Sequence, residues 1–248
     1  PVIMEPIFAI DMHVRALSTA SLGAMADIMR ATHLDEAIFA SLCRESDMYH
    51  VLQRCAILVS RMALTMPPPM FHDMVRATAS WPDLCRRLIS TSATLSHARS
   101  RKLVALGLAH MLRHASAQDK GLLSAVPDMI GMWTEVVGEV VEDEAGSADR
   151  YERELSPTRA LEIGEDGIPF LDEFGLIEAA PTPSSARTDA VRSRDPSFNV
   201  PLRAYVADTL NAVLQNGSYK TQLQSLLATI DPLVLDTLQR GLSERPVA

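Results

Sequence analysis

The stretch DPSFNVPLRAYVADTLNAVLQNGSYKTQLQSLLATIDPLVLDTLQRGL, residues 195–242, decides the fold class of this chain. Its apolar residues recur three or four positions apart in three successive segments, which is the spacing of one face of an α-helix. The three stripes are Val206, Leu210, Val213 and Leu214; Leu223, Leu226, Leu227 and Ile230; and Leu235, Leu238 and Leu242. Because a helix with one apolar stripe must bury it against another element, we expect three closing helices that dock on earlier ones.

The first 141 residues show the same helical periodicity. Leu, Ala and Met dominate their apolar parts, and runs of β-branched residues are short, which favours helix over strand. Expected helices cover residues 12–30, 34–43, 70–78, 96–114 and 122–141, with two more that begin near Asp47 and at Trp81. Helices of about 10–20 residues, paired at intervals of about 40 residues, are typical of repeat proteins. We therefore predict an all-α fold, a HEAT-like α-solenoid of antiparallel helix pairs. A compact helical bundle is the alternative.

The clearest of these helices, Ser96–His114, contains a glycine in its interior. Val104, Leu108, Met111 and Leu112 form its apolar stripe, and Gly107 interrupts it. Glycine inside a helix costs about 1 kcal/mol relative to alanine. We expect a neighbouring helix to approach closely at this position.

An acidic stretch divides the chain into three parts. Residues 142–195 hold 14 acidic and 6 basic residues, a balance of −8, which equals the formal net charge of the whole chain. Prolines and glycines are frequent in it, so we expect an acidic insertion or linker that is largely irregular. The predicted division is 1–141, HEAT-like helical repeats; 142–195, the insertion; and 196–243, capping helices of the same solenoid. The apolar run 168–177 inside the insertion is either an anchor on the solenoid surface or a short loop with incidental contacts.

Composition argues against several classes of protein. An acidic excess disfavours binding to nucleic acid, and no apolar run reaches the roughly 18 residues of a membrane span. The three cysteines, Cys43, Cys55 and Cys85, are odd in number and contain no CxxC spacing, so we expect reduced core thiols in a cytosolic or nuclear protein. The chain begins without Met and without a charged leader, and we interpret it as a fragment of a longer protein.

No motif of catalysis or of cofactor binding is apparent in the chain. His110 and His114 have the four-residue spacing of two metal ligands, but Met111 stands where a metalloprotease helix needs Glu. We interpret the pair as surface histidines near a helix C-terminus, where positive charge is favourable. We expect no enzyme activity, no metal and no cofactor.

Two charged groups are candidates for binding. Glu142, Asp143, Glu144, Glu152 and Glu154 either attract a basic protein or serve a solubilising loop without a partner. A basic ridge of Arg99, Arg101 and Lys102, with Arg113, either docks an acidic segment, such as the chain's own insertion, or is a solvated helix face. The methionines at positions 25, 29, 62, 66, 70, 74 and 111 follow helical stripes, which favours core packing over an adaptable binding groove.

Two stretches resemble the importin-β (karyopherin-β) superfamily. Ser100–Leu112, SRKLVALGLAHML, is similar to a basic-then-leucine helix of late HEAT repeats in transport receptors. The ending that begins at Asp195-Pro196, with Tyr205-Val206, Gly217 and Ile230-Asp231, resembles the carboxyl end of importin-11-type receptors. The chain is thereby identified as similar to the C-terminal part of an importin-11-like nuclear transport receptor.

The resemblance implies a HEAT-repeat receptor that binds basic protein cargo and shuttles between nucleus and cytoplasm through nuclear pores. It also implies that Ran GTPase and nucleoporins are partners through the full-length receptor, without cofactors. The family's main Ran-binding face lies in amino-terminal repeats, which nothing in this chain matches, and no cargo-contact residue can be transferred. Two alternatives remain: a helical-repeat scaffold or adaptor outside transport, and a hydrolase or metal enzyme on a helical bundle.

Overall fold

The computed structural model describes Ile7, Ile10, Asp11, Val14 and residues 19–43, 49–116, 118–119, 121–154, 195–216 and 219–243. Of residues 19–20, 141–154 and 198 it describes the backbone alone. Every regular element in these ranges is a helix, and no strand is present in them. The helices are α2 (Thr19–Ala31), α3 (Leu34–Cys43), α4 (Tyr49–Thr65), α5 (Pro68–Thr78), α6 (Trp81–Ser92), α7 (Ala98–Arg113), η1 (Leu123–Ala125), α8 (Val126–Glu154), α10 (Pro196–Asn199), α11 (Leu202–Gln215), α12 (Lys220–Leu227) and α13 (Pro232–Ser243).

Local sequence signals explain several helix ends. Ser80 is the N-cap of α6, where its hydroxyl accepts from the backbone N–H of Asp83 at 3.3 Å. Helix α5 begins at Pro68, two residues before the expected start, because proline suits the first turn of a helix. Asp195 caps α10 by accepting from the backbone N–H of Ser197 at 2.9 Å. The Asp-Pro pair is therefore a helix start, as its position after the acidic stretch suggests.

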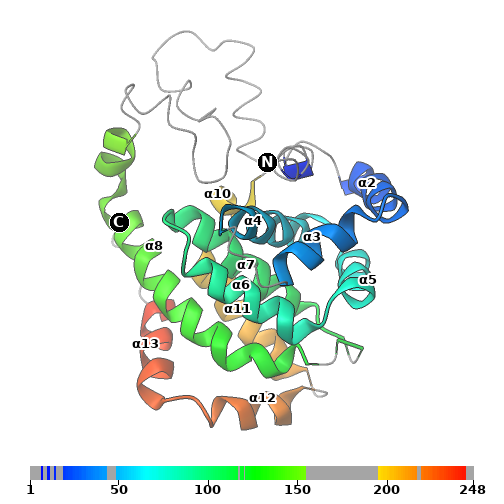
Figure 1. Cartoon of the computed structure of the whole chain (residues 1–248). Helices are drawn as coiled ribbons and strands as arrows, with labels where there is room; N and C mark the ends of the chain where they lie inside the picture. Colours follow the sequence, from blue (N-terminus) through cyan, green and yellow to red (C-terminus); the bar gives the residue numbers. More distant parts are fainter. Residues whose placement is uncertain are drawn as a thin grey trace.

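The helices stack in two layers, which confirms the predicted all-α helical-repeat fold. One layer consists of α4, α7 and α11, packed side by side, and the other of α3, α6, α8 and α13. Helix α7 also contacts α6, α8 and α10, so it lies at the centre of the molecule (Figure 1). The three closing helices dock as expected on earlier ones, with α11 against α7 and both α12 and α13 against α8.

The centre of the stack depends on Gly107. A Cβ added to Gly107 would lie 2.9 Å from both Cα and Cβ of Ser60 on α4. Real Cβ atoms essentially never come that close to another carbon, so only glycine allows this approach of α7 to α4. The expectation of a close helix neighbour at this position is confirmed.

The core is built as the sequence pattern predicts. Trp133, Phe39 and Phe71 are among its largest fully buried side chains. Met29, Met62, Met66, Met74 and Met111 are buried, and Met25 and Met70 pack partly against the same core. Cys55 and Cys85 are buried free thiols, and burial raises the pKa of each to about 12, so both stay protonated and unreactive.

Helix α8 extends beyond its predicted end. We expected it to stop at Val141, whereas its backbone is helical through Glu154. Residues 142–154 contain no proline and are rich in Glu, Ala and Arg, which favour helix over turn. The rest of the predicted insertion, residues 155–194 with the apolar run 168–177, lies outside the described residues.

Candidate functional site

Arg101 of the predicted basic ridge binds acidic residues of the neighbouring helix. Its guanidinium donates to Glu139 and lies 3.4 Å from a carboxylate oxygen of Glu135, both on α8. Arg99 and Lys102 lie beside it in the first turns of α7, are half-buried and have interaction partners. Arg101 is therefore engaged with acidic side chains of its own chain, and these come from α8 upstream of the predicted insertion.

Helix α8 extends beyond its contact with α7. Arg101, which pairs with Glu139 of α8, is only three residues from the first residue of α7, whereas α8 continues 15 residues beyond Glu139 and carries most of its acidic residues there. At about 1.5 Å per residue that continuation is about 22 Å of helix. Figure 1 shows α8 running past the stack at this end. Glu142, Asp143, Glu144, Glu152 and Glu154 lie along this backbone, although their side chains are outside the description.

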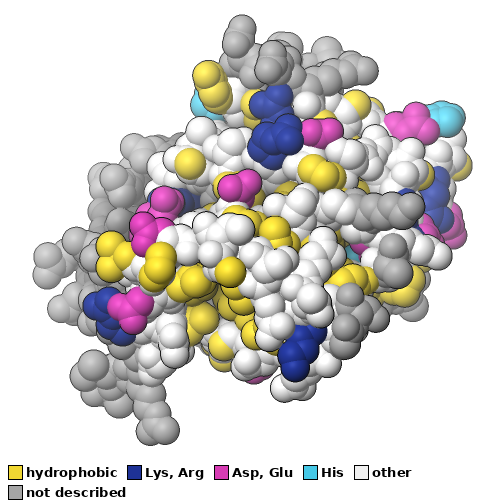
Figure 2. Space-filling view, turned by 90° about the horizontal axis from the view of Figure 1, so that it is seen from below, with side chains coloured by type: hydrophobic (Ala, Val, Ile, Leu, Met, Phe, Trp, Pro, Cys, Tyr) yellow, Lys and Arg dark blue, Asp and Glu magenta, His cyan; other side chains and the backbone are white. Residues whose placement is uncertain are grey.

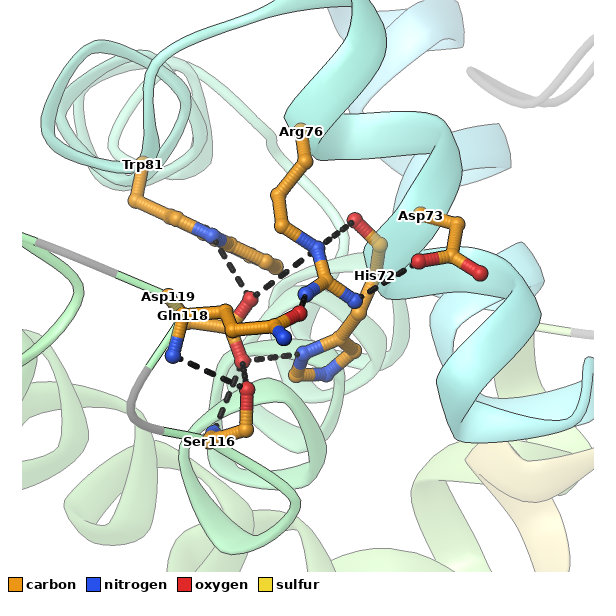
Figure 3. Close-up of polar contacts among 7 residues, drawn as sticks. All are labelled: His72, Asp73, Arg76, Trp81, Ser116, Gln118 and Asp119. Atoms are coloured by element: carbon orange, nitrogen blue, oxygen red, sulfur yellow. Dashed lines mark hydrogen bonds and ion pairs between the residues drawn. The ribbon is translucent and has the colours of Figure 1, made fainter.

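A buried polar cluster joins α5, α6 and the loop after α7 (Figure 3). Asp119 is its centre: one carboxylate oxygen accepts from Trp81 Nε1 at 3.1 Å, and the other pairs with His72 Nδ1 at 2.9 Å. The backbone N–H and the hydroxyl of Ser116 donate to the second oxygen at 2.7 and 2.8 Å. Burial alone would raise the pKa of Asp119, but the donors at Ser116 and His72 outweigh burial and hold this pKa below its usual range.

This cluster has the geometry of a structural clasp. A buried His–Asp pair is a component of many catalytic sites, but a nucleophile must then contact the second nitrogen of the imidazole. In this protein the hydroxyl of Ser116 donates to Asp119, and His72 Nε2 is buried without a hydrogen-bond partner. Arg76 of α5 also contacts the loop: its guanidinium donates to Gln118 and is held in place by Asp73, one turn earlier in α5, at 2.8 Å. The contacts fix the loop after α7 onto α5 and α6.

A second buried cluster is centred on Arg61 of α4. Its Nε atom donates to Asp11 at 2.8 Å and its Nη1 atom to Asp195 at 2.6 Å, and all three side chains are at least nine-tenths buried. Burial alone would lower the pKa of Arg61, but the two carboxylates raise it above its ordinary value. The guanidinium thereby ties α4 to a residue before α2 and to the start of α10.

The structure corrects the interpretation of His110. It is half-buried between α7 and α11, with Nδ1 hydrogen-bonded to the hydroxyl of Tyr205 at 2.5 Å. Burial, the adjacent His114 and Arg113 lower the pKa of His110 to about 4, and burial also lowers that of His114. The prediction of a favourable positive charge near this helix end is therefore wrong for His110, because α11 covers it. Arg113 lies over the Tyr205 ring, 5.5 Å from its centroid.

Helices α12 and α13 leave an apolar surface at the end of the stack. Leu223 and Leu238 are the buried side chains of these two helices, whereas Leu233 is 68% exposed. Four further apolar residues are half-buried and pack against the core, and together with exposed Leu233 we call them the terminal apolar face: Leu226, Leu227, Ile230 and Val234. Figure 2 is viewed from the side of α12 and α13 and shows hydrophobic side chains gathered across this end, with charged groups mainly toward its edges.

The described part of the chain has neither a metal-binding group of side chains nor a helix suited to span a membrane. No group of three or more His, Cys, Asp or Glu side chains there is arranged to hold a metal ion. None of its helices is both long enough and apolar enough to cross a membrane.

The sequence pattern drew attention to Arg99, Arg101 and Lys102, whose role as binding residues stays a prediction, and it gave no indication of the two buried clusters. Nothing in the local pattern around Arg61 or His72 distinguishes these residues from solvated ones. Local signals were present at Asp195, whose place before a proline marks a helix start, and at Trp81, where α6 begins. The partners of these residues lie 38 to 134 positions away in the chain, so periodicity could not reveal them.

The chain matches a known protein family. The sequence model of one protein family, described as importin-11-like TPR repeats, matches residues 7–243. The description names TPR repeats where we expected HEAT-like ones, and both kinds are stacked pairs of antiparallel helices. No curated protein and no solved structure matches the chain.

Proposed function

Because this chain belongs to the importin-11-like family of TPR-repeat proteins, we propose that it is the C-terminal part of a nuclear import receptor. The receptor binds protein cargo, carries it through nuclear pores and releases it under the control of Ran-GTP. The match over residues 7–243 is the observation that carries this proposal. The helical stack is consistent with it, because repeat proteins bind partners on extended helical surfaces.

The part of this chain best suited to cargo is the acidic half of α8. Its helical backbone continues about 22 Å beyond the Arg101 ion pair and carries Glu142, Asp143, Glu144, Glu152 and Glu154. Negative charge carried by an extended helix attracts a basic protein over roughly one Debye length, about 8–10 Å at physiological salt. The cargo that fits this region is therefore a basic protein.

Release follows from coupling between two sites of the full receptor. Ran-GTP binds repeats outside this chain and lowers cargo affinity by changing the curvature of the solenoid. Each repeat contacts its neighbours, so a small rotation at one end alters the spacing of helices at the other. In this mechanism the chain binds and releases its partner without a chemical step.

The test of transport is a pull-down with the full-length receptor, a basic cargo and Ran loaded with GTP or GDP. We expect cargo to be retained with Ran-GDP and released with Ran-GTP. Retention that does not depend on the nucleotide, for every cargo that binds, would contradict a transport role and favour a helical-repeat scaffold or adaptor.

A charge variant tests the acidic half of α8. In the full receptor, Glu142, Asp143, Glu144, Glu152 and Glu154 are changed to the corresponding amides, and cargo binding is titrated at two salt concentrations. We expect weaker binding and a smaller dependence on salt. The matched control removes five exposed carboxylates elsewhere: Asp27, Asp73, Asp128, Asp208 and Asp236. Equal losses of cargo affinity in the two variants would show that only the net charge matters and would contradict the assignment of the cargo site to α8.

A further inference from the structure

A polar contact joins the start of α11 to the last turns of α7. Nδ1 of His110 on α7 lies 2.5 Å from the hydroxyl of Tyr205 on α11, and the planes of the two rings differ by 8°. Tyr205 is the fourth residue of α11, so the contact holds the end of the helix at which the chain enters the closing block. The state of His110 therefore bears on how firmly α11 packs on α7.

The surroundings of His110 suit a neutral imidazole and not a charged one. A neutral histidine carries one N–H, whereas a protonated histidine carries an N–H on both ring nitrogens. Nε2 of His110 is buried and has no hydrogen-bond partner among the described residues. Protonation would place a donor there without an acceptor, at a cost in free energy. Water supplies the acceptor once α11 moves away and the ring is exposed.

The charged groups close to His110 are basic. The ring of His114 lies 4.4 Å from that of His110, centroid to centroid, and Arg113 follows on the same helix. His72 of α5 faces the pair from the other side of α7, and its partner Asp119 is already bonded to it and to the loop after α7. Burial, His114, His72 and Arg113 together lower the pKa of His110 to about 4.

The carboxylates on the other elements packed against α7 do not offset this charge. Glu135 and Glu139 of α8 pair with Arg101, nine residues before His110 and about 14 Å away along α7. The remaining carboxylates of these elements whose side chains the structure describes pair with arginines or are exposed to water: Asp83 with Arg86, Asp195 with Arg61, and exposed Asp128 and Asp208. A protonated His110 therefore gains none of them as a partner.

We propose that the contact of His110 with Tyr205 is acid-sensitive: it holds the start of α11 on α7 while His110 is neutral and releases it when His110 binds a proton. The closed contact is fully stable above pH 6.5 and weakens as pH falls toward 4, because the exposed imidazole binds the proton more tightly than the buried one. From these two values, the equilibrium constant for opening is up to about 20-fold larger at pH 5 than at pH 7.

Hydrogen exchange of the full chain at pH 5 and pH 7 tests the proposal. Each amide rate is divided by the rate of an unstructured peptide at the same pH, so that only the opening of the structure is compared. We expect the protection of amides 205–212 of α11 to be up to about 20-fold lower at pH 5, while amides in the buried middle of α4 keep theirs. Unchanged protection in α11, or an equal loss in α4 and α11, would overturn the proposal.

Three variants assign the effect to His110. His110→Gln can still bond to Tyr205 but cannot become charged, so we expect most of the acid-induced loss in α11 to disappear. His114→Gln removes one neighbouring charge at an exposed position, and we expect a smaller loss than in the unmodified chain. His50→Gln is the control, since His50 is exposed on α4 and lies outside this group.

Equal losses in the unmodified chain and in both the His110 and the His114 variants would overturn the assignment. The same holds if His50→Gln reduces the loss as much as His110→Gln does. Because His114 is exposed, its replacement keeps the test valid even where His110→Gln weakens the fold. The measurement contains neither cargo nor Ran, so its failure is separate from failure of the transport proposal.

Discussion

Arg61 shows how one side chain connects three distant parts of the chain. Arg61 is 2% exposed, and its guanidinium bonds to Asp11 and Asp195, which lie 50 and 134 positions away. Two carboxylates buried around one cation are stable only while the cation is present. The stability of the N-terminal contact and that of the α10 start therefore depend on the same residue.

We predict that Arg61→Met lowers the free energy of unfolding by about 3–5 kcal/mol, because it removes the cation that buried Asp11 and Asp195 share. Urea unfolding followed by circular dichroism measures this loss. Arg240→Met is the matched control, since Arg240 pairs with Asp236 at an exposed site, where such pairs contribute at most about 1 kcal/mol. Similar losses in the two variants would contradict the assigned role of Arg61.

His110 makes stability depend on pH in a defined direction. The pKa of His110 is about 4 in the folded protein against an ordinary value of 6.5. Between pH 4 and pH 6.5 this imidazole is therefore protonated in the unfolded chain and neutral in the folded chain. The stability contributed by neutral His110 is fully present above pH 6.5 and is lost as pH falls toward 4. We predict that His110→Gln, which can still bond to Tyr205, makes the free energy of unfolding depend less on pH between 4 and 6.5. Urea unfolding at pH 4.5 and pH 7 measures the free energy of unfolding of both proteins. An equal loss between pH 7 and pH 4.5 in the two proteins would contradict the prediction.

At the scale of elements, the contact of α4 with α7 is set by the absence of one side chain. Gly107 brings α7 so close to Ser60 that a methyl group has no room. We predict that Gly107→Ala destabilises the protein by about 1–3 kcal/mol, because the clash with α4 backbone outweighs the gain in helix propensity.

The control for Gly107 lies in the next helix. A Cβ on Gly138 of α8 meets no atom within 4 Å, so Gly138→Ala should raise stability by up to about 1 kcal/mol. Both variants are compared by the urea concentration at the unfolding midpoint. If both changes stabilise, the close approach of α4 and α7 is not a constraint.

At the scale of the whole molecule, the helices before residues 155–194 and those after them share one core. Helix α11 packs on α7, and α13 packs on α8. Leu202 and Val206 of α11 and Leu238 of α13 belong to the same core as residues of α4 and α7. The closing helices therefore belong to the stack although the acidic stretch separates them in sequence.

We predict that cutting the chain at a protease site engineered at residues 184–190 leaves the two fragments together. Gel filtration of the cut protein should give one peak containing both fragments, because the buried contacts of α11 and α13 remain. The same sample in strong urea is the control, and there the fragments should separate. Separation without denaturant would contradict the packing of α11 and α13 on the stack.

The amino-acid sequence by itself determined the all-α class, the positions of most helices and the close approach at Gly107. These features depend on periodicity and on backbone propensity, which act over a few residues. It also carried the resemblance to importin-11-type receptors and drew attention to Arg101, whose partners Glu135 and Glu139 only the structure revealed. The predicted end of α8 failed because an acidic composition was interpreted as irregular, although Glu and Ala also favour helix.

Only the tertiary structure decided which polar residues are buried together. His72 with Asp119, Arg61 with Asp195, and His110 with Tyr205 are pairs whose members lie 47, 134 and 95 positions apart. Such pairs form only after the layers stack in one register, so no local pattern contains them. His110 was expected to be positive and is neutral for that reason, because α11, almost one hundred residues later in the chain, packs against its ring and partly buries it.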